Sequence, residues 1–192
     1  MAIITVLPSL LGMRTGVLDF ADRIRSAGHD VRFVDYLDGQ TFDSIETARA
    51  HRDEVGAATL MARARELAKD IPDGFIPAGF SSGVGAAQGL ALSRPVRGMI
   101  AVVGGGQLSE FGKDWPADTP VQYHLMADDP YVDPSAVERE AVAIRSAGSP
   151  AEVFHYSGGG HLFFDRTLPQ DYDRQATDEM MSRVLEFVET ID

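Results

Sequence analysis

Short apolar runs alternate with longer amphipathic segments along the 192-residue chain. The short runs are rich in β-branched and aromatic residues, and most of them end at proline, glycine or a polar turn, which is typical of buried strands. We expect a strand at each of six such runs: residues 3–7, 31–34, 75–78, 98–103, 121–126 and 152–156.

Most of the segments between these runs carry apolar residues at helical spacing. Glycines near their ends and an Asp-Pro pair at one start are common helix boundary signals. We expect helices at residues 15–27, 84–92 and 134–147, and from about residue 177 to the end of the chain.

Two segments are harder to interpret from their pattern. In residues 41–69 charged side chains are dense and Gly56 interrupts the spacing. One long helix or two shorter helices would fit there, and we expect one helix at 51–69. Residues 107–119 contain proline, aspartate and the only tryptophan, Trp115, and we expect an irregular cover or lid.

Strands separated by helices predict an α/β protein with a mostly parallel sheet, flanked by helices in a three-layer sandwich. The length fits a single domain over residues 1–192, and no repeat or linker divides the chain. An apolar fraction of 44% and a charged fraction of 24% are ordinary for a soluble globular protein.

The net charge of −12 argues against nucleic acid and anionic membranes as partners, because both would repel the protein. The absence of cysteine excludes disulfides, thiolate metal sites and a cysteine nucleophile. The sequence shows neither a signal peptide nor an apolar run long enough to span a membrane. We therefore expect a cytoplasmic protein, either a monomer or a homodimer.

The pattern Gly79-Phe80-Ser81-Ser82-Gly83 follows a predicted strand and precedes a predicted helix. G-x-S-x-G in this context is typical of a nucleophile elbow, the tight turn that lifts a serine hydroxyl above a sheet. Only Ser81 has glycine two residues before it and two residues after it. Ser81 is therefore the candidate nucleophile.

An acid and a base follow at later strand ends, in the order Ser, Asp, His. Asp128 and Asp129 follow one strand, and His161 follows another after three glycines. Functional residues of a parallel sheet gather at the carboxyl ends of its strands. A serine needs an imidazole to take its proton, and the imidazole needs a carboxylate to orient it. Three residue types required for acyl transfer are thus expected to meet.

Several other residues have more ordinary interpretations. Asp133 precedes Pro134 and is expected to cap a helix. His155 and His124 lie within predicted strands, where histidines are usually structural. The spacing of histidines and carboxylates does not suggest a metal site. The glycines at 83–85 and 104–106 do not match a nucleotide-binding pattern, so we expect no cofactor.

An acyl-transfer site also needs two backbone N–H groups for the oxyanion. In an elbow one of them belongs to the residue after the nucleophile, here Ser82. The other is expected in the loop 9–11, which follows the first strand.

Four segments together resemble the dienelactone hydrolase family of α/β-hydrolases. Residues 6–12 resemble its first core strand and oxyanion loop, and residues 79–83 match its elbow. Residues 127–132 resemble its acid loop, and 156–163 resemble the segment that carries its histidine. The resemblance covers most of the chain and implies a compact α/β-hydrolase fold.

Carried over position by position, the resemblance implies Ser81 as nucleophile, Asp129 as acid and His161 as base. It also implies that Leu10 and Ser82 donate to the oxyanion. The implied activity is hydrolysis of a small ester, lactone or thioester through a seryl acyl-enzyme. A catalytically silent relative that binds a small ligand, and a flavodoxin-like module that binds phosphate, are the alternatives.

The chain departs from the family at three positions. Serine replaces the cysteine of dienelactone hydrolases proper, which favours ordinary ester chemistry. Ser9 stands where the family has an acid, and Asp165 stands where an arginine is expected to bind the substrate carboxylate. Further candidates for the substrate pocket are Met13, Arg14 and Tyr131, together with Phe111 and Trp115.

Overall fold

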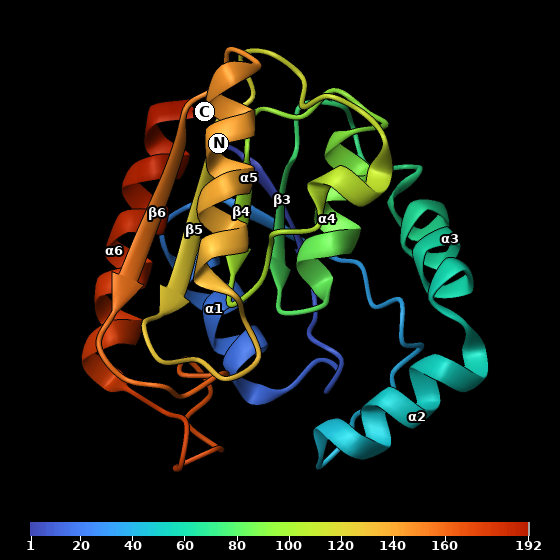
Figure 1. Cartoon of the computed structure of the whole chain (residues 1–192), viewed down its shortest axis with the longest axis vertical. Coiled ribbons are helices and arrows are strands. Elements are labelled where there is room, and N and C mark those ends of the chain that lie inside the picture. Colours follow the sequence, from blue (N-terminus) through green and yellow to red (C-terminus); the bar gives the residue numbers. More distant parts are fainter. Residues whose placement is uncertain (192) are drawn as a thin grey trace.

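The structure is a computed structural model that describes residues 1–191, and a parallel sheet runs through its middle (Figure 1). Within these residues six strands lie side by side in the order β2-β1-β3-β4-β5-β6, and every neighbouring pair is parallel. The expected α/β fold is therefore confirmed. The strands are β1 (Ile3–Leu7), β2 (Asp30–Phe33), β3 (Ile76–Phe80), β4 (Met99–Val102), β5 (Val121–Met126) and β6 (Ala151–Tyr156).

Helices cover both faces of the sheet and make a three-layer sandwich. The amphipathic helices α1 (Thr15–Ser26) and α6 (Arg174–Ile191) pack their apolar sides on one face. The helices α3 (Ala57–Ala68), α4 (Gly83–Ala91) and α5 (Pro134–Ser146) close the other face. None of the helices in the described part of the chain combines the length and apolarity needed to cross a membrane.

The chain order places a crevice between β1 and β3. From β1 the chain first moves outward to β2 and then returns to the opposite side of β1, where β3 pairs with it. In parallel sheets ligands bind beyond the carboxyl ends of the strands at such a reversal. The loop after β1 and the turn after β3 therefore meet at the place where a site is expected.

The single helix expected at 51–69 is wrong, because two helices lie there. Helix α2 (Ile45–Val55) ends and α3 begins at Gly56, whose φ of 87° lies outside the helical region. Ser44 caps α2 by accepting a hydrogen bond from the Thr47 N–H at 3.2 Å. Only Ala48 of α2 is buried, so this helix has little apolar periodicity to reveal it. In Figure 1 it lies beyond the carboxyl ends of the strands.

Residues 107–119 form the irregular cover that their sequence predicts, apart from the short 3₁₀ helix η1 (Leu108–Phe111). Trp115 is buried within this cover, and its indole N–H donates to the Thr119 carbonyl at 2.8 Å. The ring therefore packs in the core instead of facing a substrate.

Candidate active site

Ser81 occupies the tight turn between β3 and α4. Its φ of 52° lies in the left-handed region that residues other than glycine rarely adopt. A Cβ atom on Gly79 would lie 2.5 Å from the Gly83 carbonyl oxygen, and one on Gly83 would lie 2.4 Å from the Leu7 carbonyl oxygen. Both contacts are too close for any side chain. The sequence pattern therefore reflects a backbone requirement on both sides of Ser81.

Ser81, His161 and Asp129 form one chain of hydrogen bonds. The Ser81 Oγ lies 2.8 Å from His161 Nε2, and His161 Nδ1 lies 2.7 Å from Asp129 Oδ2. Because a carboxylate only accepts hydrogen bonds, Nδ1 carries the proton of the neutral ring. Nε2 then accepts the hydrogen bond of the Ser81 hydroxyl. Asp129 is itself held by the Tyr131 N–H, which donates to its Oδ1 at 2.9 Å.

The competing acids lie elsewhere. Asp128 is exposed, whereas Asp129 is buried. Asp133 caps α5, since its Oδ1 accepts the Ser135 N–H at 2.9 Å. Of the three aspartates, only Asp129 is within hydrogen-bond distance of His161.

The other two candidate histidines have structural surroundings. His155 is exposed, and its Nε2 lies 3.2 Å from Glu138 Oε1. His124 is fully buried between Tyr156 and Gln122 in the sheet. Burial, aided by the positive charge of Arg183, lowers the pKa of His124 to about 3. The ring is therefore neutral at physiological pH.

Two backbone N–H groups beside Ser81 are free to bind an oxyanion. Among the described residues neither the Leu10 N–H nor the Ser82 N–H has a hydrogen-bond acceptor. The Leu10 loop is a tight turn in which the Ser9 carbonyl accepts the Gly12 N–H and the Ser9 Oγ accepts the Leu11 N–H. Ser9 thus shapes the loop through its own hydrogen bonds.

Tyr36 connects this loop to the elbow, a role that the sequence did not suggest. Its hydroxyl donates to the Pro8 carbonyl at 2.7 Å and lies 3.2 Å from the Ser82 Oγ. Burial raises the pKa of Tyr36 to about 12. The hydrogen bond with Ser82 opposes this rise in pKa, and the negative charge of Asp35 adds to it. The hydroxyl therefore keeps its proton and links the Pro8 carbonyl to the Ser82 side chain.

A pocket of about 350 Å³ opens above Ser81 and His161. The loops that follow β1, β3, β4, β5 and β6 line it, together with α2. Tyr131 lies in its wall as expected, with its ring centroid 5.0 Å from that of His161. Met13 and Arg14 are not among the lining residues, so the structure gives neither of them a place in this pocket.

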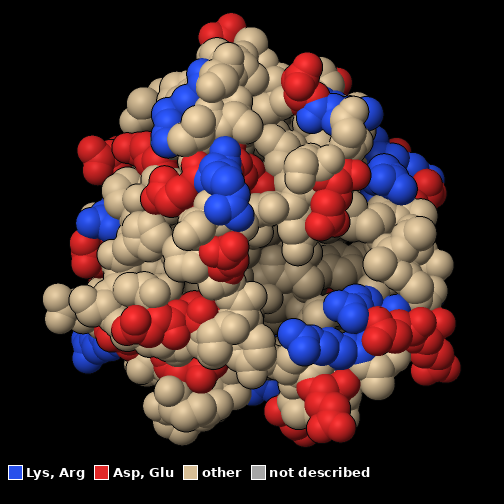
Figure 2. All heavy atoms as spheres, in the orientation of Figure 1, with Lys and Arg blue, Asp and Glu red and all other residues tan. Residues whose placement is uncertain are grey.

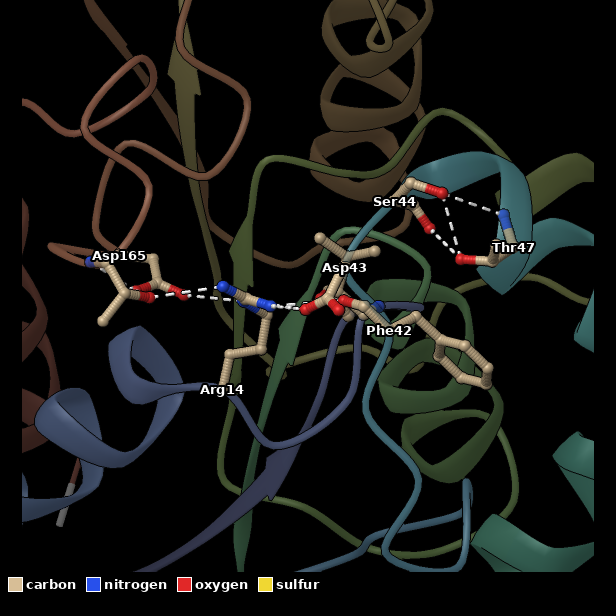
Figure 3. A network of polar contacts seen from close by, with 9 residues as sticks. Arg14, Phe42, Asp43, Ser44, Thr47 and Asp165 are labelled. Atoms are coloured by element: carbon tan, nitrogen blue, oxygen red, sulfur yellow. Dashed lines mark hydrogen bonds and ion pairs between the residues drawn. The ribbon is translucent and has the colours of Figure 1, made fainter.

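Arg14 instead joins three segments of the chain outside the lining of this pocket (Figure 3). Its Nε donates to Asp165 Oδ2 at 3.2 Å, and another of its nitrogens donates to the Phe42 carbonyl at 3.2 Å. Asp165 is only 1% exposed and also accepts two hydrogen bonds from Thr167. The family resemblance led us to expect a substrate-binding arginine at position 165. In this chain the position holds Asp165, which forms an internal ion pair with Arg14.

Two arginines of α2 lie in the pocket wall and were missed from the sequence. They are Arg49, whose guanidinium lies 5.9 Å from the centre of the Tyr131 ring, and Arg52, which also pairs with Asp53. Figure 2 shows basic side chains along one edge of the hollow on this face, over the place where Figure 1 shows α2. Arg49 and Arg52 are three residues apart, so a helix places them on one face. This spacing was the signal in the sequence that could have revealed them.

Glu140 joins η1 to the core of the protein through buried hydrogen bonds. This buried carboxylate accepts hydrogen bonds from the Tyr123 hydroxyl at 2.6 Å, the Gln88 amide at 2.5 Å and the Leu108 N–H at 2.7 Å. Burial, followed by the charge of Glu140, raises the pKa of Tyr123 well above its ordinary value. The network ties η1 to α4, α5 and β5.

The parallel sheet, the serine at a tight strand–helix turn and the His–Asp pair at later strand ends define the class of α/β hydrolases. The model of the dienelactone hydrolase family matches residues 2–192. The chain belongs to the dienelactone hydrolase family. No curated protein matches its sequence.

Solved structures show the same fold at low sequence identity. A protein called m3DLH is 17% identical with a TM-score of 0.79, and the match covers 99% of this chain and 86% of the other. The dienelactone hydrolase-like promiscuous phosphotriesterase P91 from metagenomic libraries is 18% identical with a TM-score of 0.79, covering 100% and 87%. The propionate-bound thermophilic esterase Est2 of Thermogutta terrifontis is 14% identical with a TM-score of 0.72, covering 99% and 83%.

Proposed function

We propose that this member of the dienelactone hydrolase family is a serine hydrolase that cleaves a small carboxylic ester, lactone or thioester. The observation that carries the proposal is the unbroken chain of hydrogen bonds from Ser81 through His161 to Asp129. The free N–H groups of Leu10 and Ser82 beside it support the same chemistry. P91 is named as a promiscuous phosphotriesterase and Est2 as an esterase.

Acylation begins when the Ser81 oxygen attacks the ester carbonyl carbon and His161 Nε2 takes the hydroxyl proton. The carbonyl oxygen becomes an oxyanion that accepts hydrogen bonds from the Leu10 and Ser82 N–H groups. Asp129 stabilises the imidazolium through Nδ1. The bond to the leaving group then breaks, and His161 protonates the departing oxygen or sulfur. In a lactone the leaving oxygen stays attached to the acyl group.

Deacylation repeats these steps with water. His161 takes a proton from a water molecule, the resulting hydroxide attacks the acyl carbon, and the second tetrahedral intermediate forms in the same oxyanion site. Its collapse returns the proton to the Ser81 oxygen and releases the carboxylic acid. The reaction consumes one water for each ester and requires no cofactor.

A fluorophosphonate probe tests the proposal, since an activated serine displaces its fluoride and becomes phosphonylated. We expect the probe to label the protein and the protein to hydrolyse p-nitrophenyl acetate. Ser81→Ala should abolish labelling and lower kcat by at least about 10³-fold, as loss of a triad nucleophile does. Ser157→Ala removes an exposed serine outside this pocket and serves as the matched control.

Labelling that survives Ser81→Ala would show that another residue is the nucleophile. A wild-type protein that is neither labelled nor active would favour the ligand-binding alternative.

A further inference from the structure

A second pocket of about 350 Å³ lies beside the one above Ser81. It lies between α3, α4 and η1. Its walls include Leu60 and Met61 of α3, Ala86 of α4 and Phe111 of η1. Figure 1 places α3 beside α4 on this side of the molecule.

The two pockets meet at the oxyanion site. Leu10 and Ser82, the residues with free N–H groups, line both of them, as do Arg52 and Gln107. His161 lines only the first pocket. The two substituents of an ester carbonyl point away from each other, so a carbonyl oxygen held at this border directs one substituent to each side.

The position of His161 decides which substituent goes where. His161 must protonate the leaving oxygen, so the leaving group lies on its side, in the first pocket. The acyl substituent then extends past Leu10 and Ser82 into the second pocket. Resting on the proposed serine hydrolase activity, we propose that this second pocket binds the acyl chain, and that the substrates are esters of aliphatic acids longer than acetate.

The chemistry of the walls fits an aliphatic chain. Leu60 and Ala86 are buried, and Met61 and Phe111 are half-buried and turn apolar surface to the hollow. The two charged residues of the lining, Arg52 and Glu110, keep access to solvent, and Arg52 pairs with Asp53. The Tyr36 hydroxyl at the base is already engaged by the Pro8 carbonyl and Ser82.

Chain length gives a quantitative test. Burying one methylene group is worth a factor of about four in kcat/KM when the pocket holds it in the transition state. From p-nitrophenyl acetate to the hexanoate, four methylenes are added, so we expect a rise of about 10²-fold. In the matched alcohol series, methyl to hexyl acetate, the chain lies on the His161 side and kcat/KM should stay within about fivefold.

Met61→Trp fills the second pocket and should reduce the hexanoate-to-acetate ratio of kcat/KM to below about 5. Met61→Ala enlarges the pocket and should move the best substrate to a longer acid, which tests the same site if the tryptophan variant does not fold. Leu67→Trp adds the same ring on an exposed position of α3 and should leave the ratio unchanged.

The outcomes separate this inference from the proposed function. If the protein hydrolyses the acetate and kcat/KM does not rise with acyl chain length, the acyl pocket is refuted but the proposed hydrolase activity is not. The same holds if both Met61 variants leave the acyl preference unchanged. A preference for long alcohols with short acids also overturns it. A wild-type protein that is unlabelled by fluorophosphonate and hydrolyses none of these esters refutes both.

Discussion

The ion pair between Arg14 and Asp165 gives a prediction whose size follows from burial. We consider Arg14→Met, which keeps the length of the side chain but removes its charge. Asp165 is 1% exposed, so the variant leaves a buried carboxylate without its cation. Removing one partner of a buried pair costs about 3–5 kcal/mol. Since Thr167 still donates two hydrogen bonds to Asp165, we expect the lower end, about 3 kcal/mol.

Urea unfolding followed by circular dichroism measures this loss of unfolding free energy. The melting temperature should fall by about 6–12 °C for a chain of this size. Asp165→Asn alone removes the buried negative charge, so no carboxylate is left without its cation. This variant should lower the free energy of unfolding by about 1–2 kcal/mol. The double variant should lose at least about 1 kcal/mol less than the sum of the single losses, because each substitution removes the partner of the other.

Arg23→Met is the matched control. Arg23 pairs with Asp178 at 2.7 Å, closer than the 3.2 Å between Arg14 and Asp165, but its side chain is 43% exposed and that of Asp178 is 50% exposed. An exposed pair contributes less than about 1 kcal/mol. If Arg23→Met cost as much as Arg14→Met, or if Arg14→Met cost under 1 kcal/mol, burial would not be what gives the Arg14 pair its strength.

Two further predictions concern buried polar groups. His124 has a folded pKa of about 3, below its unfolded value of about 6.5, so its neutral form stabilises the fold fully above pH 6.5 and this stability is lost as pH falls towards 3. Urea unfolding should show that the free energy of unfolding falls by about 1 kcal/mol from pH 7 to 5.5 because of His124. His124→Gln should remove this contribution to the pH dependence. If the pH dependence of the variant equals that of the wild type, His124 has an ordinary pKa in the folded protein. Tyr36→Phe removes the donor to Pro8 and the contact with Ser82, and should lower kcat for p-nitrophenyl acetate about tenfold with little change in KM. An unchanged kcat would show that the oxyanion loop holds its shape without Tyr36.

The sequence predicts the sheet well because its four inner strands are short, mostly apolar and buried on both faces. It also brings out Ser81, Asp129 and His161 as candidates, since each lies in the loop after a strand and all strands end at the same edge. The elbow was visible because its two glycines are forced by backbone contacts. A local steric rule of this kind leaves a local trace in the sequence.

Features that depend on distant partners left no such trace. Arg14 and Asp165 are 151 residues apart, and neither is distinguishable from a surface residue by its neighbours in sequence. Tyr36 likewise acts on the Pro8 carbonyl and Ser82 across the fold. The interruption at Gly56 was visible in the sequence, but one helix was preferred to two because α2 buries only Ala48 and its amphipathic pattern is weak.

The close approach of Gly83 to the backbone of Leu7 and Pro8 has a consequence for how this protein can change in evolution. The turn at Ser81 and the loop that carries Leu10 are held by close main-chain contacts and by the Tyr36 hydroxyl, while much of the pocket wall is formed by side chains of α2, α3 and η1. Substitutions in those three elements can alter which molecules are accepted while the distance between Ser81 and Leu10 stays fixed. On the proposed function, reactivity and selectivity are carried by separate parts of the chain, so substitutions on α2 and α3 can change specificity without rebuilding the turn at Ser81.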